Sequence, residues 1–267
     1  MLQRRFRNVN IDILKALLPN AFTVLNIMSG FLSIAFSFNG DFVTAAWFIV
    51  ASALLDATDG IVARALGTSS DFGVELDSLA DVTSFGVAPS VFVYVFFLQG
   101  YGIAGAVIAS LQLVCGALRL ARFNIQLTSY VKRYFIGMPI PLSALILVSS
   151  VFLLSQEELL ANQAFQYVFM SIIIVNSALM ISSVRYPIFP RFTPREFREK
   201  PMQMYTFIGG GIFIILTMGK ALFPFLLLIG LAGPISLAVK KIVKPVSVED
   251  QGFIRDKQYS EAATADT

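Results

Sequence analysis

The stretch LDATDGIVAR, residues 55–64, places two aspartates and an arginine at the end of a strongly apolar run. A second apolar segment starts a few residues later and carries Gly73, Asp77 and Asp81 at intervals of four. Residues three or four apart lie on one face of a helix, so each predicted helix presents two carboxylates along one face. The sequence therefore predicts two helices that bring four acids together.

The composition around this stretch is that of a polytopic membrane protein. Of 267 residues, 56% are hydrophobic and 14% charged, and the mean hydropathy is +0.74. This is too apolar for a soluble domain. Apolar stretches near the roughly 20 residues that cross a bilayer recur along the chain. We predict eight spans, at residues 20–38, 41–65, 71–98, 101–127, 137–155, 163–182, 204–218 and 222–239.

The expected fold is all-α, a bundle of about eight transmembrane helices, with six in a core and two after it. Residues 1–18 form a cytoplasmic or interfacial segment, because basic and apolar residues there suit either a helix on an anionic membrane surface or a simple basic flank. The remaining predicted units are the transmembrane core at 19–185, a proline-containing cytoplasmic linker at 186–203, a helical pair at 204–244 and a disordered tail at 245–267.

Basic residues give the predicted orientation, because they collect on the cytoplasmic ends of spans. They gather at alternate ends here: Arg4, Arg5, Arg7, Lys15, Arg64, Arg119, Arg122, Lys132, Arg133, Arg185, Arg191, Arg195, Arg198, Lys200, Lys240, Lys241 and Lys244. Only Lys220 falls on the opposite side. We therefore predict a multi-pass protein of the cell (inner) membrane, with both termini and the acid cluster cytoplasmic and with membrane lipids, not nucleic acid, as partners.

The acid cluster needs positive charge, because a charged side chain in the bilayer costs about 2.5–3.5 kcal/mol on insertion scales. Arg64 cannot neutralise Asp56, Asp59, Asp77 and Asp81 alone. The chain has no histidine, and its single cysteine is expected to be a core residue. Oxygen-only ligands favour a hard ion such as Mg²⁺ or Mn²⁺. A cation-coupled transport site is the alternative, although transporters usually place such acids near the membrane midplane.

The complete motif, D-x2-D-G-x2-A-R-x8-G-x3-D-x3-D over residues 56–81, resembles position for position the signature of the CDP-alcohol phosphatidyltransferases. The resemblance implies an integral membrane enzyme that displaces CMP from a CDP-linked lipid with an alcohol. It also implies a bundle of transmembrane helices that pairs as a homodimer.

Within this motif the acids have two expected roles, metal binding and proton transfer. Two divalent ions clamped between facing carboxylates can neutralise a diphosphate leaving group, with Asp56, Asp59 and Asp77 as ligands and Asp81 shared or free. An alcohol must also lose a proton, and with no histidine in the chain a carboxylate must accept it. By resemblance to the family, Asp81 is the expected base.

The small residues of the motif are the expected site for the CDP-lipid. Gly60, Ala63 and Gly73 leave room for a cytosine and ribose against the backbone, and Arg64 is placed to hold the diphosphate. Ser70, just before the second helix, is expected to contribute to the same site. The alternative for the small residues is close helix packing.

Four stretches resemble the phosphatidylserine synthase branch of the family: DSLADVTSFGVAP at 77–89, RLARFN at 119–124, FIGMPIP at 135–141 and the first-helix pattern at 18–26. This resemblance implies transfer of the phosphatidyl group from CDP-diacylglycerol to L-serine, with glycerol 3-phosphate as the alternative acceptor.

Serine presents a carboxylate, so its site should contain a cation. Arg119 and Arg122 are the candidates, with Asn124 and Ser84 as further possible contacts. Either arginine could instead be a basic anchor at the membrane surface.

Overall fold

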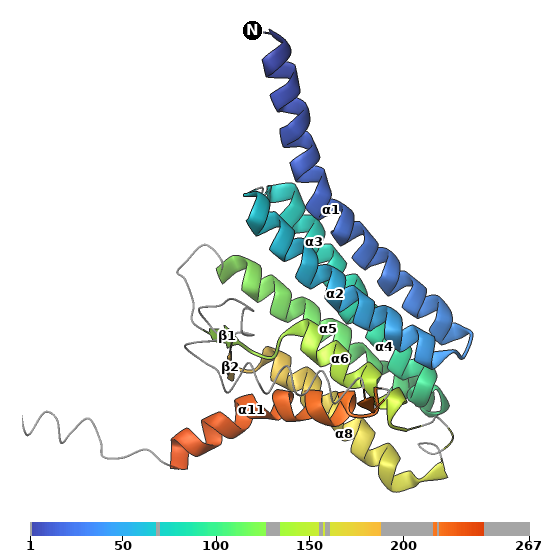
Figure 1. The fold of residues 1–267 in the computed structure, drawn as a ribbon. Coiled ribbons are helices and arrows are strands. Elements are labelled where there is room, and N and C mark those ends of the chain that lie inside the picture. The colour runs from blue at the N-terminus through green and yellow to red at the C-terminus, as the bar shows by residue number, and fades with distance from the viewer. Residues whose placement is uncertain are drawn as a thin grey trace, which may run out of the picture. The chain divides into compact units, whose positions relative to one another are not determined.

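The computed structural model describes residues 2–67, 70–126, 134–154, 157, 161–187, 216–217 and 219–242. The chain divides into two compact units, Met1–Gly233 and Pro234–Thr267, and the contacts given below lie within the first. The helices are α1 (Leu2–Phe38), α2 (Phe42–Leu66), α3 (Asp71–Asp81), α4 (Ala88–Val93), α5 (Gly102–Gln126), α6 (Ile140–Ser149), α8 (Gln163–Ile181) and α11 (Leu222–Ile242) (Figure 1). Shorter turns are the π-helical η1 (Val82–Val87) and η2 (Tyr94–Leu98) and the 3₁₀ turns η3 (Gln99–Tyr101) and η4 (Ser150–Phe152).

Four helical stretches of the described residues are long and apolar enough to cross a membrane: Leu17–Phe38, Phe42–Leu66, Asp71–Ile125 and Gln163–Ile181. The third has 55 residues and contains two predicted spans, because the chain turns at Gly102, whose φ is +56°. Ile140–Phe152 and Leu222–Leu237 are shorter apolar helices. The prediction of a polytopic all-α membrane protein is confirmed. The predicted span at 204–218 lies outside the described residues except for 216 and 217.

The first helix is longer than the pattern predicted. α1 runs unbroken through Pro19, so residue 19 does not begin a separate helix. A proline inside a helix removes one backbone donor. The hydroxyl of Thr23 lies 3.2 Å from the Pro19 carbonyl and 3.1 Å from Oδ2 of Asp59, so these two oxygens are alternative acceptors for its single proton. Whether residues 2–16 lie on the membrane surface stays a prediction.

The turn between α2 and α3 fixes the two acid-bearing helices. α2 ends at Gly67, which takes the left-handed conformation with φ +63° and donates to the Ala63 carbonyl. α3 is capped by Ser70, whose hydroxyl accepts the Gly73 N–H at 3.0 Å. The cap is Ser70, because its hydroxyl reaches the N–H three positions on, and Asp71 is the first helical residue.

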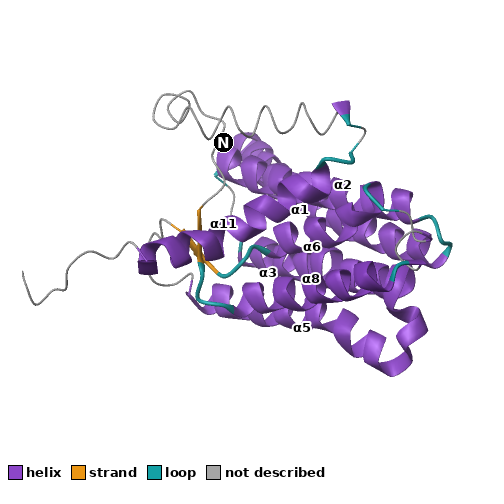
Figure 2. Cartoon of the chain, turned by 90° about the horizontal axis from the view of Figure 1, so that it is seen from below, coloured by secondary structure: helices purple, strands orange, loops and turns teal. Residues whose placement is uncertain are grey.

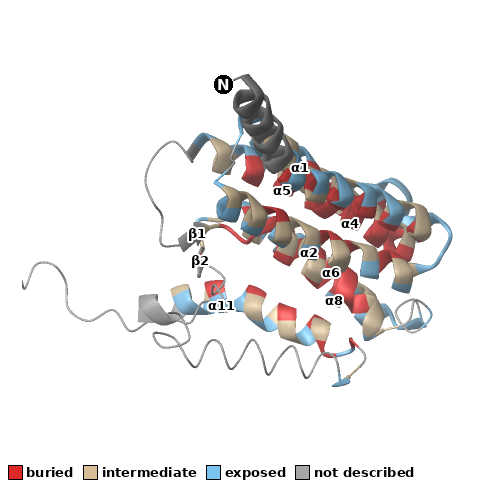
Figure 3. Ribbon diagram, turned by 45° about the horizontal axis from the view of Figure 1, so that its top comes forward, coloured by how far each residue is buried: buried red, intermediate tan, exposed pale blue. Residues whose placement is uncertain are grey.

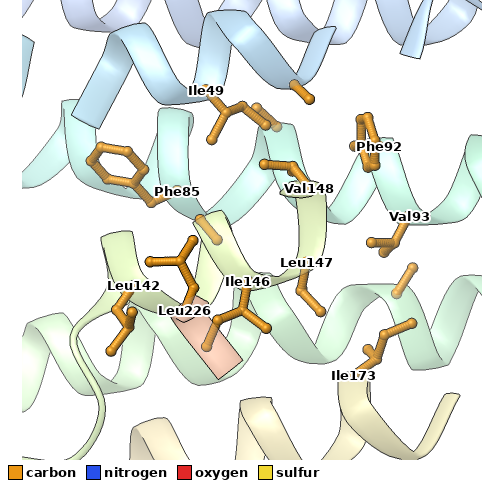
Figure 4. Packing of buried hydrophobic residues seen from close by; sticks show 14 of the residues in the cluster. Ile49, Phe85, Phe92, Val93, Leu142, Ile146, Leu147, Val148, Ile173 and Leu226 are labelled. Atoms are coloured by element: carbon orange, nitrogen blue, oxygen red, sulfur yellow. The ribbon is translucent and has the colours of Figure 1, made fainter. Parts of the chain in front are cut away.

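α2 packs along α1, and α5 packs against α8 (Figure 1). Their shared core contains fully buried residues from several helices, including Ile49, Phe85, Phe92, Leu147 and Ile173 (Figure 4). Buried residues line the inner sides of the helices while exposed residues lie outside (Figure 3). Many exposed side chains are large and apolar, as expected where helices face lipid.

A short strand pair, which was not expected from the sequence, links the segment before α6 to the segment after α8. β1 (Tyr134–Ile136) pairs antiparallel with β2 (Arg185–Pro187), with Phe135 opposite Tyr186 (Figure 2). The Tyr186 hydroxyl donates to the Gly230 carbonyl of α11 at 3.0 Å. Burial raises the pKa of Tyr186 to about 12, so the hydroxyl keeps the proton that this bond needs. The contact attaches α11 to the strand pair.

Candidate active site

Three carboxylates meet between α2 and α3. Asp56 and Asp59 come from α2 and Asp77 from α3, and one oxygen of each lies within 4.8 Å of the others. The Thr23 hydroxyl of α1 donates to Oδ2 of Asp59 at 3.1 Å. A set of close carboxylate oxygens, with no sulfur or imidazole, suits a hard divalent cation. The predicted grouping of these three aspartates is confirmed.

Asp81 lies one turn further along α3 and extends the cluster inward. Its carboxyl group is in hydrogen-bonding contact with Asp56 and close to Asp77. Oδ1 of Asp77 and Oδ1 of Asp81 are both buried, and neither has a hydrogen-bond partner among the described residues. Buried polar atoms without partners are costly. A cation bound among these oxygens would satisfy them, so the residues present fit a metal.

Two arginines interact with acids of the cluster. Arg64 interacts electrostatically with Asp59, and Arg119 of α5 with Asp81. Arg119 is only 7% exposed, and its Nε has no hydrogen-bond partner among the described residues. With all four carboxylates ionised, two guanidinium groups leave two negative charges unbalanced, whereas the hydrogen bond between Asp56 and Asp81 requires one proton on the pair when no cation is bound. From the sequence only Arg64 was expected as a counter-ion, because the approach of α5 to α3 is a tertiary contact.

A cleft of about 120 Å³ opens beside the acids. It is lined by residues from α1, α2 and α3 and the turn before α3: Pro19, Asn20, Thr23, Asp59, Gly60, Ala63, Ser70, Gly73, Val74 and Asp77. The structure thus brings four of the five residues predicted for the CDP-lipid to one cleft with two of the acids. The fifth, Arg64, is exposed, and its Nη1 lies 3.3 Å from where a Cβ at Gly60 would stand.

Gly73 is constrained by space. A Cβ there would lie 3.1 Å from Oδ1 of Asn20 and 3.2 Å from the Ser70 hydroxyl. Such contacts are tighter than carbon and oxygen normally make, so glycine keeps the cleft open between α1 and α3.

Polar residues of α1 complete the site and were given no role from sequence. Asn20 and Thr23 line the cleft, and Asn26, one turn deeper than Thr23, is fully buried. Both polar atoms of the Asn26 amide lack a partner among the described residues. The Asn26 carbonyl accepts hydrogen bonds from the hydroxyls of Ser52 at 3.3 Å and Ser84 at 2.9 Å. The signal was the spacing of polar residues at about one per turn in an otherwise apolar helix.

Ser84 and Asn124, predicted as contacts of the acceptor, both have partners inside the protein. The Ser84 hydroxyl is fully buried and donates to the Asn26 carbonyl. The Asn124 amide donates to the Ser78 hydroxyl at 2.9 Å. These bonds join η1 to α1 and α5 to α3.

Arg122 differs from Arg119 in what it touches. Its guanidinium donates to the carbonyls of Ile181 at 2.9 Å, Ile136 at 3.2 Å and Ser182 at 3.5 Å. Arg122 therefore closes the C-terminal end of α8 onto β1, where a cation also complements the helix dipole. Of the two predicted arginines, the structure brings only Arg119 to the acid cluster.

Comparisons with known proteins agree with this geometry. The family model described as CDP-alcohol phosphatidyltransferase matches residues 16–188. A CDP-diacylglycerol–serine O-phosphatidyltransferase of Helicobacter pylori is 42% identical over 175 residues, covering 66% of this chain and 73% of that protein. A protein of the same name from Methanocaldococcus jannaschii is 42% identical over 169 residues, covering 63% and 72%. An archaetidylserine synthase of Methanothermobacter thermautotrophicus is 40% identical over 173 residues, covering 64% and 69%.

The matched region contains the four aspartates, the cleft, and Arg64, Arg119 and Arg122. More than half of the chain therefore matches the sequence pattern of one family, and the acid cluster and the cleft lie within that part. The chain belongs to the CDP-alcohol phosphatidyltransferase family.

Proposed function

We propose that this protein transfers the phosphatidyl group of CDP-diacylglycerol to L-serine and releases CMP. The observation that carries the proposal is the constellation of Asp56, Asp59, Asp77 and Asp81 beside a cleft bordered by glycine backbone. Three similar proteins have names that specify serine as the acceptor. The product is a phosphatidylserine, so the protein is an enzyme of phospholipid synthesis.

The four aspartates are the proposed ligands of two divalent ions, Mg²⁺ or Mn²⁺. Such ions, when bound, neutralise the diphosphate and stabilise the departing CMP. With all four carboxylates ionised, two divalent ions would change the net charge of the acids and the two arginines from minus two to plus two. An anionic diphosphate would then enter a cationic site.

The reaction is a direct displacement at the phosphorus bonded to the diacylglycerol. The serine hydroxyl oxygen forms a bond to this phosphorus, the bond from phosphorus to the CMP oxygen breaks, and CMP keeps the electron pair. Asp81 accepts the hydroxyl proton. Asp81 suits this role because it extends the cluster beyond the three aspartates whose oxygens lie within 4.8 Å of one another. Arg64, lying over Gly60, is placed to hold the diphosphate at the cleft.

Arg119 is the proposed partner of the serine carboxylate. A guanidinium can donate two parallel hydrogen bonds to a carboxylate, and the unpartnered Nε of Arg119 is available for one of them. The electrostatic interaction between Arg119 and Asp81 supports this role, because the proposed partner of the serine carboxylate and the proposed base then lie close together. Ser84, Asn124 and Arg122 already bond within the protein, so we give them supporting roles.

The site is proposed to face the cytoplasm from the cell's inner membrane, because basic residues gather at the ends of the spans that carry it. There it would meet water-soluble serine. A homodimer is also proposed. Cross-linking in native membranes that yields only monomers would contradict the dimer.

CMP release by detergent-solubilised protein tests the function. Purified protein receives CDP-diacylglycerol and Mn²⁺ or Mg²⁺ together with L-serine, glycerol 3-phosphate or inositol phosphate. We expect serine-dependent release that disappears in Asp81→Asn and persists in Asp71→Asn, whose carboxylate is exposed on the same helix. Release with glycerol 3-phosphate instead would keep the chemistry and change the acceptor. Silence with every acceptor, in folded protein, would favour a cation transporter.

A further inference from the structure

A chain of buried hydrogen bonds crosses the bundle on the opposite side of η1 from α1. The Asn176 amide of α8 donates to the Ser143 hydroxyl of α6 at 2.7 Å and to the Ser143 carbonyl at 3.1 Å. The Ser143 hydroxyl donates to Oε1 of Gln112 in α5 at 2.7 Å. Nε2 of Gln112 donates to the Phe85 carbonyl of η1 at 3.0 Å. The side chains of Gln112, Ser143 and Asn176 are all buried.

The chain ends on a backbone group that the helix cannot satisfy in the ordinary way. In an α-helix the Phe85 carbonyl would accept from the N–H four residues later, but that residue is Pro89, which has no N–H. η1 is π-helical, and the N–H of Ala88 bonds the Thr83 carbonyl five residues back. The Gln112 amide therefore donates to the Phe85 carbonyl, for which Pro89 offers no N–H.

This π-helical turn directly follows Asp81. α3 ends at Asp81 and η1 begins at the next residue. The direction in which Asp81 points from α3 therefore depends on how η1 is held. π-helical turns inside α-helices are frequent at functional sites, because they reset the face that a helix presents.

η1 is fixed from two sides. On one side Ser84 bonds the Asn26 carbonyl of α1, and Gly30 allows the approach, since a Cβ there would lie 2.5 Å from the Ser84 hydroxyl. On the other side Gln112 bonds the Phe85 carbonyl, while the Phe85 ring is buried in the core (Figure 4). Side chain and carbonyl of Phe85 are thus both held.

We infer that Gln112 is a positioning residue: its bond to the Phe85 carbonyl holds η1 so that Asp81 faces Asp56 and Arg119. The role rests on the proposed function of Asp81. If the hydrogen-bond chain were purely structural, breaking it would lower stability without a specific loss of turnover. The two roles are separable because Gln112 touches η1, whereas Ser143 touches only Gln112 and Asn176 among the contacts above.

The test compares Gln112→Met with Ser143→Ala. Met keeps the length of the side chain and removes both the donor to Phe85 and the oxygen that accepts from Ser143. Ser143→Ala removes the two bonds of the hydroxyl and leaves the Gln112 donor beside Phe85. CMP release is measured at saturating and at varied serine, with thermal unfolding of both variants in detergent. We expect Gln112→Met to lower kcat by about 10- to 100-fold, as small misplacements of a catalytic group do, with the KM for serine changed less than about threefold. Ser143→Ala should lower the unfolding temperature at least as much and keep kcat within about threefold.

Equal losses of kcat in Gln112→Met and Ser143→Ala would overturn the positioning role, because the two variants share the loss of the bond between Gln112 and Ser143 and differ at the Phe85 carbonyl. If the unaltered protein releases no CMP, the proposed function fails and this role with it; an active unaltered protein with an equally active Gln112→Met contradicts the positioning role alone.

Discussion

The acid cluster and the Gln112–Ser143–Asn176 chain are both polar regions inside apolar helices, and they treat their polar atoms differently. The chain passes hydrogen bonds from α8 to η1 with donors matched to acceptors. In the cluster, oxygens of Asp77 and Asp81 and the Nε of Arg119 are buried without partners among the described residues. Polar groups in a membrane are expensive and are retained where they hold helices or bind ligands. The Gln112–Ser143–Asn176 chain holds helices together, and the acid cluster fits ligand binding.

The largest effect should follow from removing one carboxylate of the cluster. Asp56→Asn should lower kcat by at least about 100-fold, because a preorganised charge at the reacting phosphate is lost. The metal-free variant should unfold at the same or a higher temperature than the unaltered protein, since repulsion among the acids falls. Thermal unfolding with and without Mn²⁺ measures both states.

The matched control for Asp56→Asn is again Asp71→Asn. The unaltered protein and the control should gain unfolding temperature when Mn²⁺ is added, because a ligand that binds only the folded state stabilises it. Asp56→Asn should lose most of this gain. A destabilised Asp56→Asn that keeps its Mn²⁺ response would mean that the cluster, like the Gln112 chain, is structural.

The two arginines of α5 offer the same comparison between a ligand-binding role and a structural role, on one helix. Removing Arg119 by Arg119→Gln should raise the KM for serine by about 10- to 100-fold, the value of a charge-assisted hydrogen bond of roughly 1.5–3 kcal/mol. The KM for CDP-diacylglycerol should change far less. Arg122→Gln should instead lower the unfolding temperature, because three carbonyls at α8 and β1 lose their donor. Equal increases in both KM values for Arg119→Gln would contradict the serine assignment.

These arginines also show what could be predicted from sequence. The spacing of Asp56, Asp59, Asp77 and Asp81 predicted their meeting because helical periodicity and a short turn are local properties. The apolar runs predicted most spans for the same reason. Arg119 and Arg122 are identical in local pattern, and only the packing of α5 against α3 and α8 separates them.

Other features had weaker local signals. The π-helical turn after Asp81 depends on a donor from Gln112, 27 residues away. The pairing of β1 with β2 joins segments about 50 residues apart. Helix α1 continues through Pro19, where a boundary at a proline was the reasonable expectation. In each case a tertiary contact overrides or adds to local propensity.

Neighbouring residues of α8 test the structural side of the comparison. Asn176→Leu removes both donors to Ser143 and should lower the free energy of unfolding by about 1–2 kcal/mol, near the upper range for hydrogen bonds between membrane helices. Ser177→Ala is the control, since the buried Ser177 hydroxyl has no partner among the described residues. Its loss should be neutral or stabilising. Unfolding in mixed detergent micelles measures the free energy for both variants. A larger loss of stability for Ser177→Ala would contradict the structural role of the Gln112–Ser143–Asn176 chain.

The smallest expected effect concerns the shape of the cleft. Gly73→Ala adds a methyl group 3.1 Å from Oδ1 of Asn20 and 3.2 Å from the Ser70 hydroxyl, so α1 and α3 must separate by a few tenths of an ångström or the side chains must turn into the cleft. Either change should raise the KM for CDP-diacylglycerol by about two- to tenfold. This corresponds to the lower end of the roughly 1–3 kcal/mol that overpacking costs, or less. Gly100→Ala, with nothing within 4 Å of the new Cβ, is the matched control and should leave both KM values unchanged. Because Gly73 borders the cleft and not the proposed serine site, an increase confined to the serine KM would place the acceptor where the nucleotide is now assigned, and the two substrate positions would have to be exchanged.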